Sequence, residues 1–107
     1  MMETYIAPPE TRSGTPLTRE HLRRRLLDAG LAAANEREQP PMSPGAPTFW
    51  SITLAESPAI IVHFQEVAAE LVFATLEQSA FDETGIPDRV CRVLEDLGWT
   101  VDQENVG

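Results

Sequence analysis

The sequence contains no lysine, and all eight of its basic residues are arginines. Its single cysteine, Cys91, excludes an internal disulfide and any metal site built only from cysteines of one chain. A glycine-rich phosphate loop, the zinc motif H-E-x-x-H and the nucleophile motif G-x-S-x-G are all missing. We therefore predict no cofactor, no metal and no catalytic residue, and expect a protein that is not an enzyme.

Targeting signals are missing as well. The N-terminus carries Glu3 and lacks the basic and apolar segments of a signal peptide. The longest apolar-rich stretch, residues 57–80, is interrupted by His63, Gln65, Glu66 and Glu70, whereas a membrane span needs about 20 mostly apolar residues. A lone cysteine also fits a reducing compartment. These features predict a cytoplasmic protein without a membrane partner.

Positive charge is scarce in the second half of the chain. Residues 1–55 hold six acids and six arginines, which sum to zero. Residues 56–107 hold eleven acids and two arginines, which gives the whole net charge of −9. Such a surface repels nucleic acid and attracts basic partners. We therefore expect a basic protein partner and regard nucleic acid as disfavoured.

Residues 57–80 contain the pattern of a buried helix. Ser57 is a suitable N-cap, and Pro58 would occupy the first helical position. The polar residues follow at steps of three, four and seven, which places them on one helical face. These polar residues are His63, Glu66, Glu70 and Glu77. Apolar side chains cover the remaining circumference, so the pattern predicts a core helix with one polar stripe.

Two strands are the alternative for this segment, because Ile60, Val62 and Phe64 alternate with other residues as in a half-buried strand. The connection between them would be residues 66–69, which contain no Gly, Pro, Asn or Asp to form a turn. We therefore predict a helix over 66–79. For residues 59–65 the sequence fits both a helix and a strand, and we favour the helix.

The N-terminal part combines one predicted helix with two irregular segments. Residues 1–16 hold three prolines and are expected to form a flexible arm. Thr18 begins a helix that extends to about residue 29, where Gly30 and Leu31 provide a stop signal. Residues 31–38 are a candidate continuation of this helix. The segment 39–48 holds four prolines and is predicted to be an internal loop of a single domain, 17–107.

The C-terminal part offers the clearest strand and a last helix. Phe49–Leu54 alternates apolar and polar residues and predicts a strand. Residues 81–87 read as a loop, and Asp88 is the expected N-cap of a helix that ends at Gly98 and Trp99. Trp99–Asp102 is a candidate edge strand beside Phe49–Leu54. The apolar face of this last helix would consist of Val90, Val93, Leu94 and Leu97.

These elements predict an α+β fold, a small helix-dominated single domain with a short sheet. The alternative is an α-β-β-β-α order with a three-strand antiparallel meander.

The functional prediction is a non-catalytic regulator or inhibitor that docks a basic partner through its acidic C-terminal half. The candidate partner-binding residues are His63, Glu66, Glu70 and Glu77. The alternative is a small enzyme or enzyme subunit that uses His63 with Glu66 or Glu70 as a general base. Self-association is a further alternative, because Phe49, Phe73 and Phe81 are more aromatic surface than one small core needs.

A secondary basic patch lies on the first predicted helix and consists of Arg19, Arg23, Arg24 and Arg25. It is the basis of a third alternative, nucleic-acid binding through phosphate contacts. Glu20 and Asp28 lie within helical reach of these arginines and favour an internally paired surface instead. Cys91 is a candidate reactive thiol near a helix start, or else a small core residue.

Overall fold

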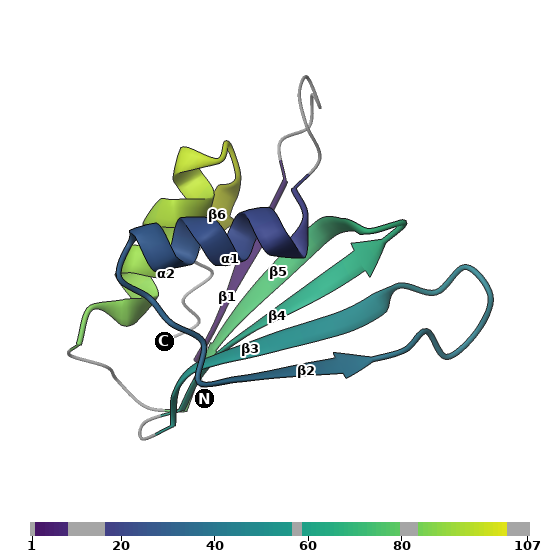
Figure 1. Ribbon diagram of the computed structural model, residues 1–107, viewed down its shortest axis with the longest axis horizontal. Coiled ribbons are helices and arrows are strands. Elements are labelled where there is room, and N and C mark those ends of the chain that lie inside the picture. The colour runs from purple at the N-terminus through teal and green to yellow at the C-terminus, as the bar shows by residue number, and fades with distance from the viewer. Residues whose placement is uncertain (1, 9–16, 57–58, 80–83, 103–107) are drawn as a thin grey trace.

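In the computed structural model, which describes residues 2–8, 17–56, 59–79 and 84–102, an antiparallel sheet of six strands carries two helices on one face (Figure 1). The elements are β1 (Met2–Ala7), α1 (Arg19–Asp28), β2 (Asn35–Gln39), β3 (Thr48–Glu56), β4 (Ala59–Val67), β5 (Glu70–Gln78), α2 (Ile86–Asp96) and β6 (Thr100–Asp102). The strand order is β2-β3-β4-β5-β1-β6. The prediction of a helix-dominated domain is therefore wrong, and the three-strand alternative is wrong too, because the β3–β4–β5 meander is only part of a larger sheet.

The predicted central helix over 66–79 is replaced by the β4–β5 hairpin. The hairpin turns through Ala68 and Ala69, which adopt φ values of 53° and 65° and are flanked by the pair Val67 and Glu70. Positive φ at both central residues characterises a two-residue hairpin turn, which normally uses Asn-Gly. Because alanine is not a typical turn residue, the sequence contains no signal for this turn. The expected cap at Ser57 and Pro58 lies outside the described residues.

The core forms between the sheet and the two helices. Trp50 and Ile52 from β3, and Ile60, Val62 and Phe64 from β4, are each at most 1% exposed. They alternate with side chains on the opposite face, as the period of a strand requires. Leu22 and Leu26 from α1, with Val90 and Leu94 from α2, close this core from above. The apolar face predicted for the last helix is thus confirmed at Val90, Val93 and Leu94.

Two bulges adjust the sheet. Leu54 is the extra residue where the β3–β4 register shifts between Thr53 and Ala55. Val72 is the extra residue on β5, because Gln65 pairs with Phe73 while the next residue, Glu66, pairs with Leu71. A bulge reverses the alternation of faces along its strand. For this reason Leu71 and Ala74 are both buried although they are three residues apart.

Three segments outside the β3–β4–β5 meander also form strands of the sheet. Residues 2–7, expected to belong to a flexible arm, form β1 between β5 and β6. Residues 31–38, a candidate helical continuation, lead instead into β2, an edge strand whose residues are all exposed. The predicted C-terminal edge strand exists as β6, but it pairs with β1 and not with β3.

The helix ends follow the predicted signals at three of four points. Thr18 caps α1, and its hydroxyl accepts a hydrogen bond from the His21 amide. Gly30 and Gly98 adopt φ values of 79° and 90°, and the amides of the residues after them bond back to Leu26 and Leu94. Asp88 is not a cap, because α2 begins at Ile86 after Gly85. No helix among the described residues is long and apolar enough to cross a membrane.

Candidate functional site: the open face of the sheet

The sheet face opposite α1 and α2 carries no covering element within the described residues, and we call it the open face. Its side chains alternate with the buried residues of each strand. Away from the β4–β5 turn, the open-face residues of these five strands are Glu3 and Tyr5 on β1, Asn35, Arg37 and Gln39 on β2, Phe49, Ser51 and Thr53 on β3, Ile61, His63 and Gln65 on β4, and Phe73, Thr75 and Glu77 on β5.

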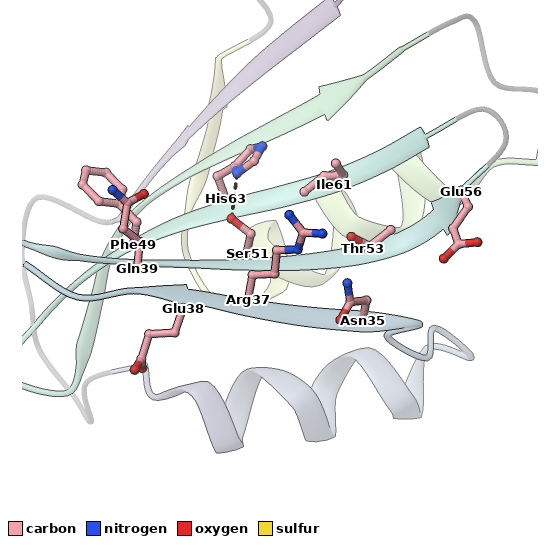
Figure 2. A pocket seen from close by; sticks show the side chains of 10 residues that line it. All are labelled: Asn35, Arg37, Glu38, Gln39, Phe49, Ser51, Thr53, Glu56, Ile61 and His63. Carbon is pink, nitrogen blue, oxygen red and sulfur yellow. Dashed lines mark hydrogen bonds between the residues drawn. The ribbon is translucent and has the colours of Figure 1, made fainter.

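The pairing register aligns these side chains in three rows across the strands. The middle row runs from Arg37 through Ser51, His63 and Thr75 to Tyr5, each residue directly opposite the next. Figure 2 shows Arg37, Ser51 and His63 side by side on β2, β3 and β4. His63 therefore occupies the centre of the open face, two strands from Arg37 and two strands from Tyr5.

One half of the open face is hollowed into a groove of about 610 Å³ over β2, β3 and β4 (Figure 2). Its lining residues are Asn35, Arg37, Glu38, Gln39, Phe49, Ser51, Thr53, Glu56, Ile61 and His63. Phe49 is 39% exposed, so the groove presents an aromatic ring together with amide, hydroxyl and imidazole groups. Mixed apolar and polar linings of this kind are typical of binding surfaces.

The other half of the open face carries carboxylates. Glu3 on β1 lies directly opposite Glu77 on β5. Like charges in directly opposite positions destabilise a sheet. Glu70 pairs with Val67 beside the hairpin turn, at the other end of β5 from Glu77. We call the opposed pair Glu3 and Glu77 the acidic margin.

A line of polar contacts crosses the centre of the open face. The Ser51 hydroxyl oxygen lies 2.8 Å from Nδ1 of His63, and Nε2 of His63 lies 3.7 Å from a carboxylate oxygen of Glu77. A serine, an imidazole and a carboxylate in sequence are the elements of a nucleophilic triad. The strand containing Ser51 is, however, paired on both sides, with Arg37 and with His63, so its amides are used in the sheet and form no oxyanion hole.

The structure divides the predicted partner-binding residues between the two faces. His63 and Glu77 lie together on the open face, and Glu70 lies on the same face by the register of its strand. Glu66 lies on the helix-covered face, where its carboxylate accepts two hydrogen bonds from Arg19, at 2.9 and 2.7 Å. The predicted pairing of His63 with Glu66 as a catalytic unit is therefore wrong.

Arg19 and Arg23 of the predicted basic patch have a structural role. Each guanidinium lies 5.2 Å from the centre of the buried Trp50 ring, a cation–π geometry. Arg23 forms a forked ion pair with Glu36, whose carboxylate also accepts the indole N–H of Trp50 at 3.1 Å. These bonds lower the pKa of Glu36 and raise that of Arg23. Helix α1 is thereby fixed to β2 and β3.

The remaining two arginines of this patch, Arg24 and Arg25, lie in the second half of α1. Arg24 lies 4.0 Å from Glu20, and both side chains are largely exposed. Glu36, Glu38 and Glu66 surround the Arg19 and Arg23 pair, so this region has no excess of positive charge. It lacks the basic field that phosphate binding requires.

Cys91 is a core residue. It is 9% exposed, and burial together with the nearby Glu95 and Asp88 raises its pKa to about 11. A reactive thiol needs the opposite, a lowered pKa in positive surroundings. The predicted alternative of a reactive thiol is therefore unsupported.

No group of three or more metal-ligating side chains occurs within the described residues. The chain matches no known protein family, no curated protein and no solved structure.

Sequence reasoning missed Glu3, Tyr5, Arg37 and Ser51 as members of this surface. The alternation of Phe49–Leu54 placed Ser51 on the outer face of a strand, but only the pairing register places it beside His63. For Glu3 and Tyr5 no signal existed, because residues 1–16 contain three prolines and few apolar residues.

Proposed function

We propose that this protein is a non-catalytic, protein-binding regulator or inhibitor whose docking surface is the open face. The observation that carries the proposal is the cross-strand pair of Glu3 and Glu77 on an uncovered sheet face. Two carboxylates held opposite each other lower the stability of the free protein, and a basic group from a partner would relieve that repulsion. Glu66 is no longer part of the proposed surface.

The partner we propose is a protein with a basic surface. The net charge of −9 supports it, because complementary charge increases the rate of encounter. Phe49, Tyr5, Ile61 and Phe73 would supply apolar contact next to the carboxylates. The proposed location is the cytoplasm, and it rests on the single, buried Cys91.

The test is affinity capture with matched variants. The protein with Glu3→Gln and Glu77→Gln is compared with a control that changes Glu95→Gln on the exposed side of α2. We expect a partner retained by the wild type and the control, lost by the double variant, and released as salt rises from about 0.1 M to about 1 M. Equal retention by all three proteins across this range would refute docking at the acidic margin.

An acyl-transfer activity is the second candidate, and only the Ser51–His63–Glu77 line favours it. It predicts that a fluorophosphonate probe labels Ser51, and that His63→Ala abolishes the labelling. Absence of labelling in the wild type would remove this alternative. We favour the binding function because the amides around Ser51 are engaged in the sheet.

A further inference from the structure

The open face is complementary to itself. Relative to β4, strands β3 and β5 lie one position to either side, and β2 and β1 lie two positions to either side. A two-fold axis along β4 would therefore place β2 of one copy over β1 of the other, and β3 over β5. Isologous contacts of this type are the commonest way in which identical chains associate.

The charges match in this arrangement. Arg37 on β2 is exposed and has no ion-pair partner in the part of the chain that the structure describes. Across the axis it would lie over Tyr5 of the second copy, one row, or about 7 Å, from Glu3 on the same strand and diagonal to Glu77 on the next strand. The guanidinium of Arg37 would add a permanent positive charge to this pair of carboxylates, beside the Tyr5 hydroxyl that donates to Glu3 at 3.0 Å and the His63 imidazole that lies 3.7 Å from Glu77.

The apolar groups and the shape match as well. Phe49 on β3 and Phe73 on β5 occupy the same row. Phe49 of one copy would therefore lie over Phe73 of the other copy. Tyr5 and Phe73 contact each other with ring centroids 6.2 Å apart. These two rings would face the groove over β2, β3 and β4. Aromatic pairs between facing sheets add to the free energy of area burial.

The size of the face suits a dimer. Five strands at about 4.8 Å spacing and three rows at about 7 Å give roughly 500 Å² in projection. The accessible area exceeds this projection because the side chains stand out from the sheet, and a stable interface buries roughly 800 Å² per partner. Facing sheets pack about 10 Å apart, which is the space that these side chains fill.

Pairing of two copies edge to edge is disfavoured. The exposed strand β2 reads Asn-Glu-Arg-Glu-Gln. Antiparallel pairing of two such strands about Arg37 would place Arg37 opposite Arg37, and Glu36 opposite Glu38. Like charges in opposite positions are a recognised protection of sheet edges. The charges on β2 therefore disfavour self-association through this edge of the sheet.

We propose that the partner of the open face is a second copy of this chain, in a symmetric dimer in which Arg37 of each copy lies against Glu3 and Glu77 of the other. This inference rests on the proposed function, because it identifies the basic surface that the acidic margin binds. Two chains of charge −9 repel at long range, and salt screens that repulsion. The dimer should therefore persist at high salt, whereas a complex with a foreign basic protein should dissociate.

The test is sedimentation equilibrium of the full chain and its charge-reversal variants, from low to several hundred micromolar. Arg37→Glu and Glu77→Arg should each weaken dimerisation on the order of tenfold or more, because each variant would bring like charges together at both symmetry-related contacts of the dimer. An equimolar mixture of the two variants should dimerise again, since both contacts then join opposite charges. The double variant R37E/E77R should also dimerise. Arg92→Glu on α2 is the control and should behave as the wild type.

A monomeric wild type over this range overturns the inference, and so does a dimer that is indifferent to both reversals or whose variants do not recover on mixing. Circular dichroism melting of each variant separates a lost contact from a lost fold. The outcome is independent of the capture experiment. A monomer that still retains a foreign basic protein through Glu3 and Glu77 would uphold the proposed function while refuting the dimer.

Discussion

The hairpin turn at Ala68 and Ala69 offers a test in which the sign of the result distinguishes sheet from helix. Both alanines have left-handed φ values, 53° and 65°. A residue with a Cβ atom in this region costs roughly 1–2 kcal/mol, because the Cβ approaches the following carbonyl oxygen. We predict that the double substitution Ala68→Asn and Ala69→Gly, the preferred pair for this turn, stabilises the protein.

The expected gain follows from two opposing terms. Relief of strain is worth roughly 1–2 kcal/mol for Ala69→Gly and less for Ala68→Asn, because asparagine keeps its Cβ atom. Glycine also raises the entropy of the unfolded chain, which costs about 0.4–1 kcal/mol. The net effect over both positions is about 1–2 kcal/mol. For a domain of this size each kcal/mol shifts the melting temperature by roughly 4–8 °C. If residues 66–79 were a helix, the same substitutions would instead cost about 1.5 kcal/mol.

Thermal melting and urea unfolding measure this change, and an unaltered urea m-value would show that the folded and unfolded states keep their compactness. The matched control is Ala32→Asn with Ala33→Gly, an exposed pair between α1 and β2 without positive φ. The control should be neutral or lose up to about 1 kcal/mol. A hairpin variant that melts at or below the wild-type temperature would refute the reasoning.

Three further predictions concern the core and its boundary. Leu71→Ala removes a side chain that is 1% exposed and should cost about 2–5 kcal/mol in urea unfolding; an unchanged midpoint would contradict its burial. Because the folded pKa of Glu36 is lowered, its contribution to stability is present above the unfolded value of 4.5 and is lost as pH falls below it. Glu36→Gln should therefore melt closer to its own neutral-pH temperature at pH 3 than the wild type does. With a pKa of about 11, native Cys91 should react with iodoacetamide on the order of 100-fold slower than an exposed thiol at pH 8; equal rates in native and denatured protein would contradict the burial.

Local signals in the sequence were sufficient for the helices at either end of the domain. The Thr18 cap and the Gly30 and Gly98 stops act through bonds between residues three to five apart, so a single window contains all the information. The strand Phe49–Leu54 was also predictable, because its alternation is complete in six residues. Met2–Ala7 was not, because β1 is stabilised by β5 and β6, which lie more than 60 residues away in the sequence.

The central segment was wrongly predicted as a helix because the spacing of its polar residues fits both the helical period and the strand period. His63 and Glu77 differ by fourteen, which is four turns of a helix and also an even number of strand positions. The two-residue turn at Ala68 and Ala69 and the extra residue Val72 preserve that agreement on the open face. Glu66 breaks it, since it lies an odd number of positions from His63 and points toward Arg19. An ion pair with an arginine 47 residues away is tertiary information, and the charge pattern alone did not distinguish a carboxylate tied to a helix from one exposed on the open face.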